Sequence, residues 1–383
     1  METYDVIVIG GGLAGCAAAY HLGKLGARAL LLEAGSLCSG TSAACAGRVQ
    51  LVESESPEYL RLALDGYQQL QALAGELALD LELESRGHLT LIRSEQDWAS
   101  WQARISAFGR LAQPAEMLDA AALVEAEPYL EPSDWLGAAY TLEGHVNPFH
   151  LCLGYAEAAR RLGVEVRTHE PVERLETQGG RVSAALTGRG RYPAGALLLA
   201  GGAWTGELAA LAGGSLPMRY THAEALISEP LPRVVHHHIG LSGFYEAVHG
   251  GERTVTLGVG QHRNGTLFIS NAIEPMERIG FQSSDWGPPA LARAFGRLFP
   301  RLARARIVRS WAAPSPFFPD ALPAVGWLPG VEGLYLAAGF HLAIPTIAAL
   351  GESIARSALG GPLSGWLEKF NPARFSSGGL AIH

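Results

Sequence analysis

The chain opens with Asp5-Val6-Ile7-Val8-Ile9-Gly10-Gly11-Gly12-Leu13-Ala14-Gly15, and Glu33 closes the next apolar run. This order predicts a strand, a glycine turn, a helix and a second strand that ends in an acid. Gly10 permits the tight turn, Gly12 lets the backbone approach a pyrophosphate, and Gly15 lets helix and strand pack closely. The helix N-terminus would face the phosphates, and Glu33 would accept hydrogen bonds from a ribose. The sequence therefore predicts a site for an ADP-containing dinucleotide, NAD included, in preference to a glycine-rich turn without a ligand.

Length, composition and charge narrow the class of protein. The 383 residues suggest two domains, and a hydrophobic share of 48% supports large cores. We expect no signal peptide, because the first strand starts almost at Met1, and no run approaches the ~18 apolar residues of a membrane span. The formal charge of −8 and the lack of a basic run argue against nucleic acid as a partner. The four cysteines form no C-x-x-C pair, which argues against an iron–sulfur or zinc framework and fits a reducing cytoplasm.

Two more apolar strands run into glycines, at 196–202 and 333–339, and a strand-rich segment over 216–311 separates them. Such a divided arrangement is unlike a nicotinamide dehydrogenase, which usually keeps its nucleotide half contiguous. Apolar spacing predicts helices over 57–79, 95–111, 115–127, 149–162, 290–299 and 345–359, and strands over 87–92, 138–143, 164–167, 171–175, 223–229, 240–248, 254–259, 265–270 and 305–311.

Five segments of the chain are familiar as a set: VIVIGGGLAGCAAAYHLGKLGARALLLE, SGTSAACAGRV, LLLAGGAWTGELAALAG, WAAPSPFFPDALPAVG and LYLAAGF. They resemble the family of FAD-dependent amine and amino-acid oxidoreductases that includes D-amino-acid oxidase, glycine oxidase and sarcosine oxidase. The resemblance implies an α/β fold with a Rossmann-like, discontinuous FAD-binding domain over 1–86, 145–215 and 312–383. A second, α+β substrate or partner domain over 87–144 and 216–311 would be built on a mixed or antiparallel sheet with helices on one face.

The resemblance also implies how a non-covalent FAD is held. The 41–47 loop would run beside the flavin, and the backbone of Val172 would meet the adenine. Gly339 would open a last helix whose N-terminus points at the pyrimidine end of the flavin. The implied set is Gly10, Gly12, Leu13, Ala14, Gly15, Glu33, Ala34, Thr41, Ser42, Ala43, Cys45, Ala46, Gly47, Val172, Ala200, Gly201, Gly202, Trp204, Gly339, Phe340, His341, Leu342 and Ala343. Covalent attachment is not expected, because no cysteine follows Cys152.

Candidates for the substrate side are fewer. Relatives commonly carry an arginine in a W-A-G-x-R-P segment to bind a substrate carboxylate, but Ser315 stands there in this chain. Ala343 and Ile344 also occupy positions where glycine is usual. The proposed catalytic set is His341, from its place near the flavin, Arg48, which follows the flavin loop, and Tyr245 with His249, which share a strand face. A surface arginine and a half-buried strand face are the alternatives for the last three.

Two other polar groups have more than one interpretation. His222 and Glu224 also share a strand face, either in the substrate site or in a half-buried surface. The run His236-His237-His238 looks like a metal cluster. Adjacent residues of a strand point to opposite faces, however, and no acid pattern surrounds the run, so no metal is expected.

The activity implied by the resemblance is oxidation of a C–N bond in an amine, imino acid or opine-like amino acid, by hydride transfer to FAD. The segments SPEYLRLALDGYQQLQALAGELALDLELESRGHLTLI, EGHVNPFHLCLGYAEAARRLG and NPARF look closest to the FAD subunits of multi-subunit opine, hydroxyproline and hydrogen-cyanide-forming dehydrogenases. That branch implies a second (alpha) subunit, with a small iron–sulfur subunit as an option. It also implies a cytoplasmic place, with peripheral contact at the inner membrane face as an option. The alternatives are a non-catalytic flavoprotein subunit, as scaffold or electron relay, and a lone oxidase that uses oxygen.

Overall fold

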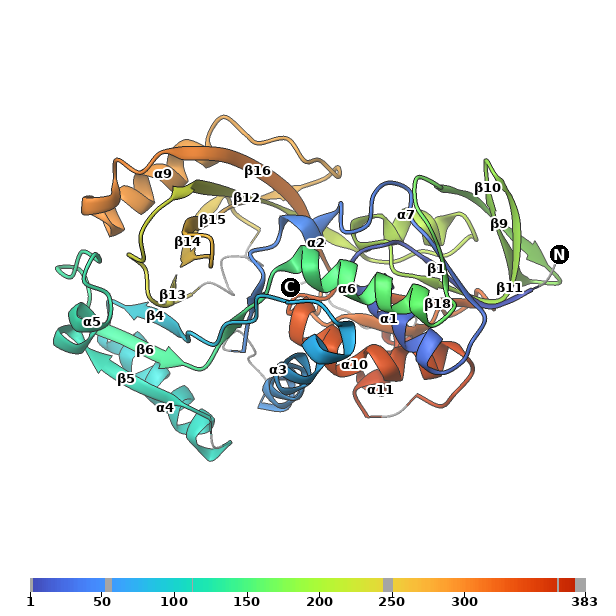
Figure 1. Ribbon diagram of the computed structural model, residues 1–383, viewed down its shortest axis with the longest axis horizontal. Coiled ribbons are helices and arrows are strands. Elements are labelled where there is room, and N and C mark those ends of the chain that lie inside the picture. The colour runs from blue at the N-terminus through green and yellow to red at the C-terminus, as the bar shows by residue number, and fades with distance from the viewer. Residues whose placement is uncertain (1–2, 52–56, 112, 244–250, 364, 376–383) are drawn as a thin grey trace.

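The computed structural model describes residues 3–51, 57–111, 113–243, 251–363 and 365–375. Figure 1 shows two lobes side by side, each built around its own β-sheet, with the short helix α2 (Thr41–Ala44) between them. The chain crosses between the lobes several times, so each lobe is assembled from segments that are far apart in sequence. This arrangement confirms the predicted α/β fold with a second, α+β part.

The first sheet contains the strand that leads into the glycine turn. Its order is β17-β18-β11-β1-β2-β8, and β9 and β10 continue from β11 as an antiparallel meander. β1 pairs in parallel with β2 and β11, and β11 with β18, so the carboxyl ends of these strands meet at one edge. The strands are β1 (Tyr4–Ile9), β2 (Ala29–Leu32), β8 (Glu165–Arg167), β9 (Val172–Gln178), β10 (Arg181–Thr187), β11 (Gly190–Leu199), β17 (Ala324–Trp327) and β18 (Leu334–Ala338).

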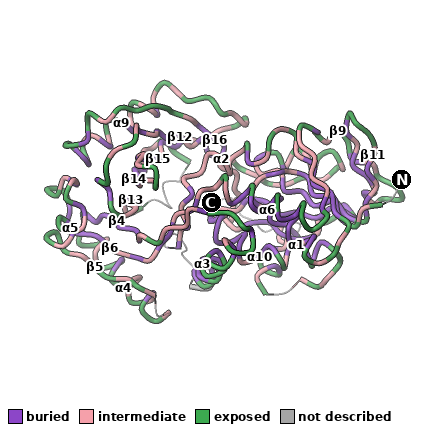
Figure 2. Tube along the Cα trace, in the orientation of Figure 1, coloured by how far each residue is buried: buried purple, intermediate pink, exposed green. Residues whose placement is uncertain are grey.

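Both faces of this sheet are covered, which is why its central strands are continuous apolar runs. Val6 and Val8 pack toward the helices, whereas Ile7 and Ile9 pack toward the meander and α7. Figure 2 shows buried residues concentrated in this lobe. The helices are α1 (Leu13–Lys24), α3 (Pro57–Leu77), α6 (Pro148–Arg161), α7 (Thr205–Ala210), α10 (Ala343–Ala358) and α11 (Trp366–Lys369), with short 3₁₀ turns at Gly202–Trp204 and Pro372–Phe375.

The second sheet is mixed. Its order is β16-β12-β15-β14-β13-β4-β6-β5, and every neighbouring pair is antiparallel except β13 with β4. The strands are β4 (His88–Ile92), β5 (Ala115–Asp119), β6 (Gly137–Thr141), β12 (Arg219–Pro230), β13 (His238–Leu241), β14 (Thr254–Gln261), β15 (Thr266–Met276) and β16 (Ile307–Phe317). A separate two-stranded pair, β3 (Arg48–Val49) with β7 (Gly144–His145), lies where the chain passes between the lobes.

Helices cover both faces of the second sheet, and not one face as expected. α5 (Ala120–Ala126) and α9 (Gly287–Leu298) pack on the face that carries Leu89 and Ala138. α4 (Glu95–Arg110) packs on the opposite face, where Trp101 meets Ile92 and Ala139. A 3₁₀ turn at Pro300–Leu302 follows α9.

Two sequence expectations differ from the structure in detail. The helix expected over 115–127 begins only at Ala120, because residues 115–119 pair with β6 as an edge strand and Asp119 caps the helix by accepting the N–H of Ala122. The apolar spacing extended through this cap and concealed it. The predicted domain boundary at 311/312 lies inside β16, which pairs with β12 as far as Phe317. In the described part of the chain, none of the helices combines the length and apolarity that a membrane span requires.

Two glycines of α3 give a matched test of this packing. A Cβ on Gly66 would overlap the carbonyl oxygen of Pro345 at the start of α10, whereas a Cβ on Gly75 would meet no atom within 4 Å. We expect G66A to lower the free energy of unfolding by about 1–3 kcal/mol through overpacking. G75A should raise it by about 0.5–1 kcal/mol, because alanine favours the helix. Chemical denaturation of both variants checks this, and equal effects would contradict the α3–α10 contact.

Candidate active site

A cavity of about 1170 Å³ runs from the glycine turn after β1 to the inner face of the second sheet. Its walls come from both lobes, from the carboxyl ends of β1, β2, β11 and β18 on one side and from β4, β12, β13, β15 and β16 on the other. The volume exceeds the range of about 300–1,000 Å³ that is typical of sites for a drug-sized ligand. The cavity therefore has room for a dinucleotide together with a small substrate.

The glycines and Glu33 form the nucleotide end of the cavity. Gly10 has φ +114°, which side chains rarely adopt, and a Cβ on Gly15 would overlap the Gly10 carbonyl oxygen. Glu33 accepts hydrogen bonds from the backbone N–H groups of Gly11 at 2.6 Å and Gly35 at 2.7 Å. Because an ionised carboxylate has about four acceptor positions, these bonds orient Glu33 and leave positions for ribose hydroxyls.

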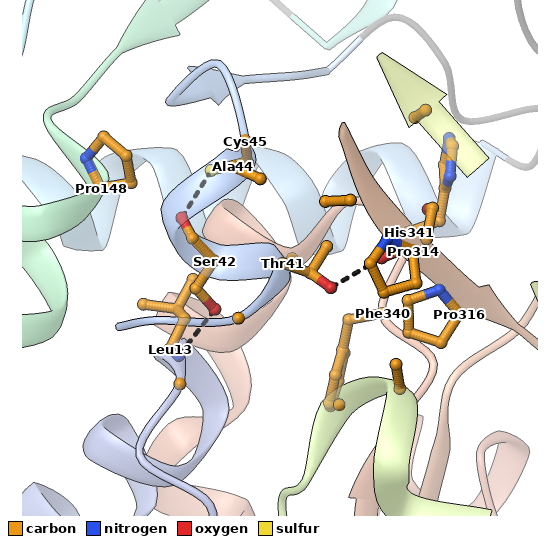
Figure 3. A pocket seen from close by; sticks show the side chains of 18 of the residues that line it. Leu13, Thr41, Ser42, Ala44, Cys45, Pro148, Pro314, Pro316, Phe340 and His341 are labelled. Atoms are coloured by element: carbon orange, nitrogen blue, oxygen red, sulfur yellow. Dashed lines mark hydrogen bonds between the residues drawn. The ribbon is translucent and has the colours of Figure 1, made fainter. Parts of the chain in front are cut away.

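The N-terminus of α1 also opens to the cavity. Its cap residue, Gly12, lines the cavity, and a Cβ there would meet only the hydroxyl of Ser42, at 3.1 Å. The same hydroxyl accepts the backbone N–H of Leu13 at 3.1 Å. Figure 3 shows this bond between α2 and the start of α1. Backbone N–H groups, a helix dipole and a hydroxyl thus meet where a pyrophosphate would lie.

Helix α2 links this end to the second sheet. The small residues expected to form a loop beside the flavin make one helical turn, with Thr41 donating to the carbonyl of Pro314 at 2.7 Å. The indole N–H of Trp311 donates to the carbonyl of Ala44 at 3.1 Å. Figure 3 shows Thr41 reaching Pro314, with Phe340 and His341 nearby. Both ends of α2 are therefore fastened to β16.

Most predicted cofactor residues line the cavity: Gly10, Gly12, Leu13, Ala14, Glu33, Ala34, Thr41, Ser42, Cys45, Ala46, Val172, Ala200, Gly201, Gly202, Trp204, Gly339, Phe340, His341 and Ala343. Gly15, Ala43, Gly47 and Leu342 do not. Gly15 lies inside the β1–α1 crossing, and Leu342 and Ala43 pack in the core of the first lobe. Gly47 has φ +72°, and a Cβ on it would overlap the carbonyl oxygen of Val146. These four therefore lie outside the cavity lining, and contact of the others with FAD stays a prediction.

The inner face of the second sheet forms the floor of the cavity. Alternate residues in the first half of β12 face it, namely Thr221, Ala223 and Ala225. The floor also contains His88, Thr90, His238, Gly240, Leu241, Gly258, Phe268, Ser270, Asn271, Ile273, Trp311, Ala313 and Ser315. Helix α4 adds Trp101 and Arg104 to the wall. The floor is thus made of small, apolar and neutral polar side chains.

Arg48 lines the cavity as a paired cation and not as a surface arginine. Its Nε donates to Glu143 at 2.6 Å, and the two side chains are only 9% and 1% exposed. The other carboxylate oxygen of Glu143 accepts the N–H of Leu51 at 2.9 Å. Of the lysines and arginines, all of which lie in the described ranges, only Arg48 and Arg104 line the cavity. Ser315 faces the cavity opposite Thr221, so a hydroxyl stands where relatives carry arginine.

His88 and His238 form a pair in the floor. Their Nδ1 atoms are 3.0 Å apart, the rings are stacked, and Nε2 of His88 lies 3.0 Å from the hydroxyl of Thr90. A Cβ on Gly240 would lie 2.8 Å from the His88 ring, and one on Gly260 would lie 3.0 Å from the His238 ring. Glycine on these strands therefore makes room for both imidazoles.

Both imidazoles are neutral at pH 7. Burial lowers the pKa of His88 and of His238 well below the usual range, and the charge of Arg48 adds to the effect. A bond between two Nδ1 atoms needs one donor and one acceptor, which two neutral tautomers supply. Sequence reasoning missed His88, although its alternation with Leu89, Thr90 and Leu91 indicated a strand with one polar face.

The remaining predicted residues are placed differently. His341 lines the cavity two residues after Gly339, and Figure 3 labels it among the lining residues. Tyr245 and His249 lie outside the described residues. His222 and Glu224 face away from the cavity, because Thr221, Ala223 and Ala225 occupy its side of β12. An acid does meet the histidine run, since Glu127 accepts the N–H groups of His236 and His237 and lies 2.9 Å from His237 Nδ1.

Comparisons with known proteins agree with this geometry. A family model described as "DAO: FAD dependent oxidoreductase" matches residues 5–357. The chain is 28% identical to hydrogen cyanide synthase subunit HcnC of Pseudomonas protegens, over 92% of this chain and 91% of that protein. It is also 28% identical to glycine oxidase of Geobacillus kaustophilus, over 89% and 88%. The crystal structure of a glycine oxidase from G. kaustophilus superimposes with a TM-score of 0.87 at 24% identity, covering 98% of this chain and 99% of that one.

Buried histidines behind the floor predict acid sensitivity. Burial lowers the pKa of His145 and of His262, whose rings are 4.6 Å apart, to about 4. An unfolded chain would protonate them at about 6.5, so the stability they contribute is lost as pH falls from about 6.5 to about 4. We expect H262Q to reduce the drop in thermal midpoint between pH 7 and pH 4.5. H150Q, at a half-exposed histidine, is the control, and an unchanged drop in H262Q would refute the linkage.

Proposed function

Because the chain belongs to the DAO family of FAD-dependent oxidoreductases, we propose that it oxidises the C–N bond of an amine, imino acid or opine-like amino acid. The observation that carries this proposal is the continuous cavity, which joins a dinucleotide end to a floor holding a neutral histidine pair. Oxidation of an amine by a bound redox cofactor requires the cofactor site and the substrate site to adjoin, as the two ends of this cavity do.

The residues of the nucleotide end fit FAD. The N–H groups at the start of α1 and the Ser42 hydroxyl would hold its pyrophosphate, and Glu33 would hold its ribose. Helix α10 begins at Ala343 without a side-chain cap, so its N–H groups and dipole favour negative charge on a ring placed there. When bound, FAD supplies a two-electron acceptor for a hydride that leaves the carbon beside the amine nitrogen.

The histidine pair would accept the proton that a substrate ammonium must lose. An amine is oxidised from its neutral form, because the nitrogen lone pair becomes part of the C=N bond as the hydride leaves the carbon. His238 lines the cavity, is neutral, and is hydrogen-bonded to His88, which in turn lies beside Thr90. The imine that remains would then be hydrolysed by water.

The floor favours substrates that do not depend on an arginine clamp. The charge of Arg48 is already matched by Glu143, and Ser315 offers only a hydroxyl. Arg104, the other cation of the lining, belongs to α4 in the wall, where its guanidinium lies over the ring of Trp101. Thr90, Thr221 and Ser270 provide further neutral hydrogen-bonding groups. A secondary amine or imino acid held mainly by such groups and by Trp311 fits this floor better than a small amino acid that is held by its carboxylate.

We also propose that the chain works with partners. The matched relative from P. protegens is named as one subunit of an enzyme, and the sequence of our chain contains no C-x-x-C motif of the kind that ligates an iron–sulfur cluster. An alpha subunit, with a small iron–sulfur subunit as an option, would then receive the electrons. Co-purification of the tagged chain from its own cell tests this, because a chain that is isolated alone and yields peroxide with oxygen would point to a lone oxidase.

A second candidate is a non-catalytic flavoprotein subunit that serves as scaffold or electron relay. Ser315 in place of the arginine favours it, as do Ala343 and Ile344, which add side chains to the cavity wall where glycine is usual. In that case the cavity would bind FAD without a reacting substrate.

Anaerobic reduction separates the two functions. We expect the purified, FAD-loaded chain to lose its flavin absorbance on addition of N-alkyl amino acids, imino acids or opines. E33A should retain less FAD, because the ribose loses its acceptor, and it controls for binding at the predicted site. Flavin bands that persist across the whole panel, with FAD bound, would reject the enzyme and favour the relay.

Proton acceptance by the histidine pair makes a separate prediction. H238Q should slow anaerobic flavin reduction at pH 7 by about 10²–10⁴-fold, the usual contribution of a general base. The loss should shrink toward alkaline pH, where the substrate amine is already neutral. H237Q is the matched control, since His237 faces Glu127. A pH-independent defect in H238Q would indicate a structural role, and an unchanged rate would exclude the pair.

A further inference from the structure

The outer face of the second sheet carries a polar cluster remote from the cavity. His222 on β12 lies directly opposite Glu274 on β15 in the antiparallel register, and Glu224 follows two residues along on the same face. Both strands are covered here by the segment 277–286 and by α9, which Figure 1 shows along this side of the lobe. The dinucleotide site does not use these residues.

Three ligand atoms converge in this cluster. Nδ1 of His222 is 3.8 Å from Oε1 of Glu224 and 3.8 Å from Oε1 of Glu274, and all three atoms lie within 4.8 Å of one another. A point equidistant from such atoms is at most roughly 2.5 Å from each, so shifts of a few tenths of an ångström would reach the Zn–N and Zn–O distances of about 2.0–2.2 Å. The spacing suits one small cation.

The tautomer of His222 indicates that its Nδ1 is available as a metal ligand. Its Nε2 lies 2.9 Å from the carbonyl oxygen of Gln282, which can only accept, so Nε2 carries the proton. In the neutral ring Nδ1 is then a lone pair that faces two carboxylates. His222 is 7% exposed, and this Nδ1 is buried with no hydrogen-bond partner among the described residues. Such an arrangement is unfavourable unless a cation lies between the three groups.

The surroundings are those of a metal site. Histidine ligands usually donate their other ring N–H to a carbonyl, as His222 does to Gln282, and ligand carboxylates are usually hydrogen-bonded in turn. Glu224 accepts the backbone N–H of Ser284 at 2.9 Å and also the Ser284 hydroxyl. Arg253 donates to Oε2 of Glu274 at 2.9 Å, which leaves Oε1 directed at the cluster.

We propose that His222, Glu224 and Glu274 bind a divalent metal ion of the Zn²⁺ class. One nitrogen and two carboxylate oxygens suit such an ion, and water would complete the coordination. Because Ser284 also accepts the N–H of Gly287 at the first turn of α9, the ion would tie β12, β15 and the start of α9 together. The site stabilises the outer layer of the second lobe and takes no part in the oxidation.

Metal content can be measured independently of flavin chemistry. The FAD-loaded protein is stripped with a chelator, incubated with ZnCl₂, passed through a desalting column and analysed for zinc by mass spectrometry. We expect about one ion per chain and a rise in thermal midpoint. H222Q and E274Q should weaken zinc binding by at least about 10–100-fold, because loss of an outer-shell partner alone typically costs that much metal affinity, and should leave flavin absorbance unchanged. Glu224 is left intact, because its carboxylate also holds Ser284.

Two matched variants control for surface binding. H237Q removes a histidine that meets a single buried acid, and E252Q removes an exposed acid close in sequence to Arg253. Both should keep one zinc per chain. Zinc retained equally by H222Q and E274Q would show binding elsewhere and overturn the proposal. A wild-type protein that binds no zinc would also overturn it.

Discussion

The backbone crossing at Gly10 is the constraint on which the rest of the structure depends. A Cβ there would overlap the carbonyl oxygen of Ala200, and a Cβ on Gly15 would overlap that of Gly10. β1, α1 and β11 therefore meet with no side chain between them. The parallel strands end at this edge, so the glycine units after β1, β11 and β18 all open into one cavity. Cofactor binding is thus a consequence of close backbone packing, which tolerates little substitution.

The second lobe reaches the cavity through α2 and β16. Hydrogen bonds from Thr41 to Pro314 and from Trp311 to Ala44 hold β16 of the second sheet against the short helix α2. Because side chains alternate between the two faces of a strand, β12 carries two sets of residues with different roles. Residues such as Thr221 and Ala223 face the cavity, whereas His222 and Glu224 face α9 and the outer layer. Neighbouring residues of β12 can therefore serve different purposes without interference.

Three groups of buried polar residues show how charge is accommodated around the cavity. Glu143 is paired with Arg48, Glu127 binds two backbone N–H groups and His237, and the histidine pair in the floor is uncharged. This follows from the cost of an unmatched charge in a medium of low dielectric constant. The consequence for chemistry is that the imidazoles next to the cavity are uncharged and keep a nitrogen lone pair, while the same burial opposes their protonation.

The sequence by itself determined the dinucleotide turn, the three strand-to-glycine units, the α/β class and the family, because these depend on local spacing and on backbone freedom at particular glycines such as Gly10. It could not determine the floor of the cavity. His88, Thr221, His238 and Ser315 come from four different strands of the second sheet, and their meeting depends on strand order and register. Nor could the sequence show that the side chain of His222 on β12 points away from the cavity. Period-two alternation defines two faces of a strand, but it does not say which face lines the cavity and which is covered by a helix. Only the tertiary structure decided that, through the contacts of α2, α4 and α9 with the second sheet.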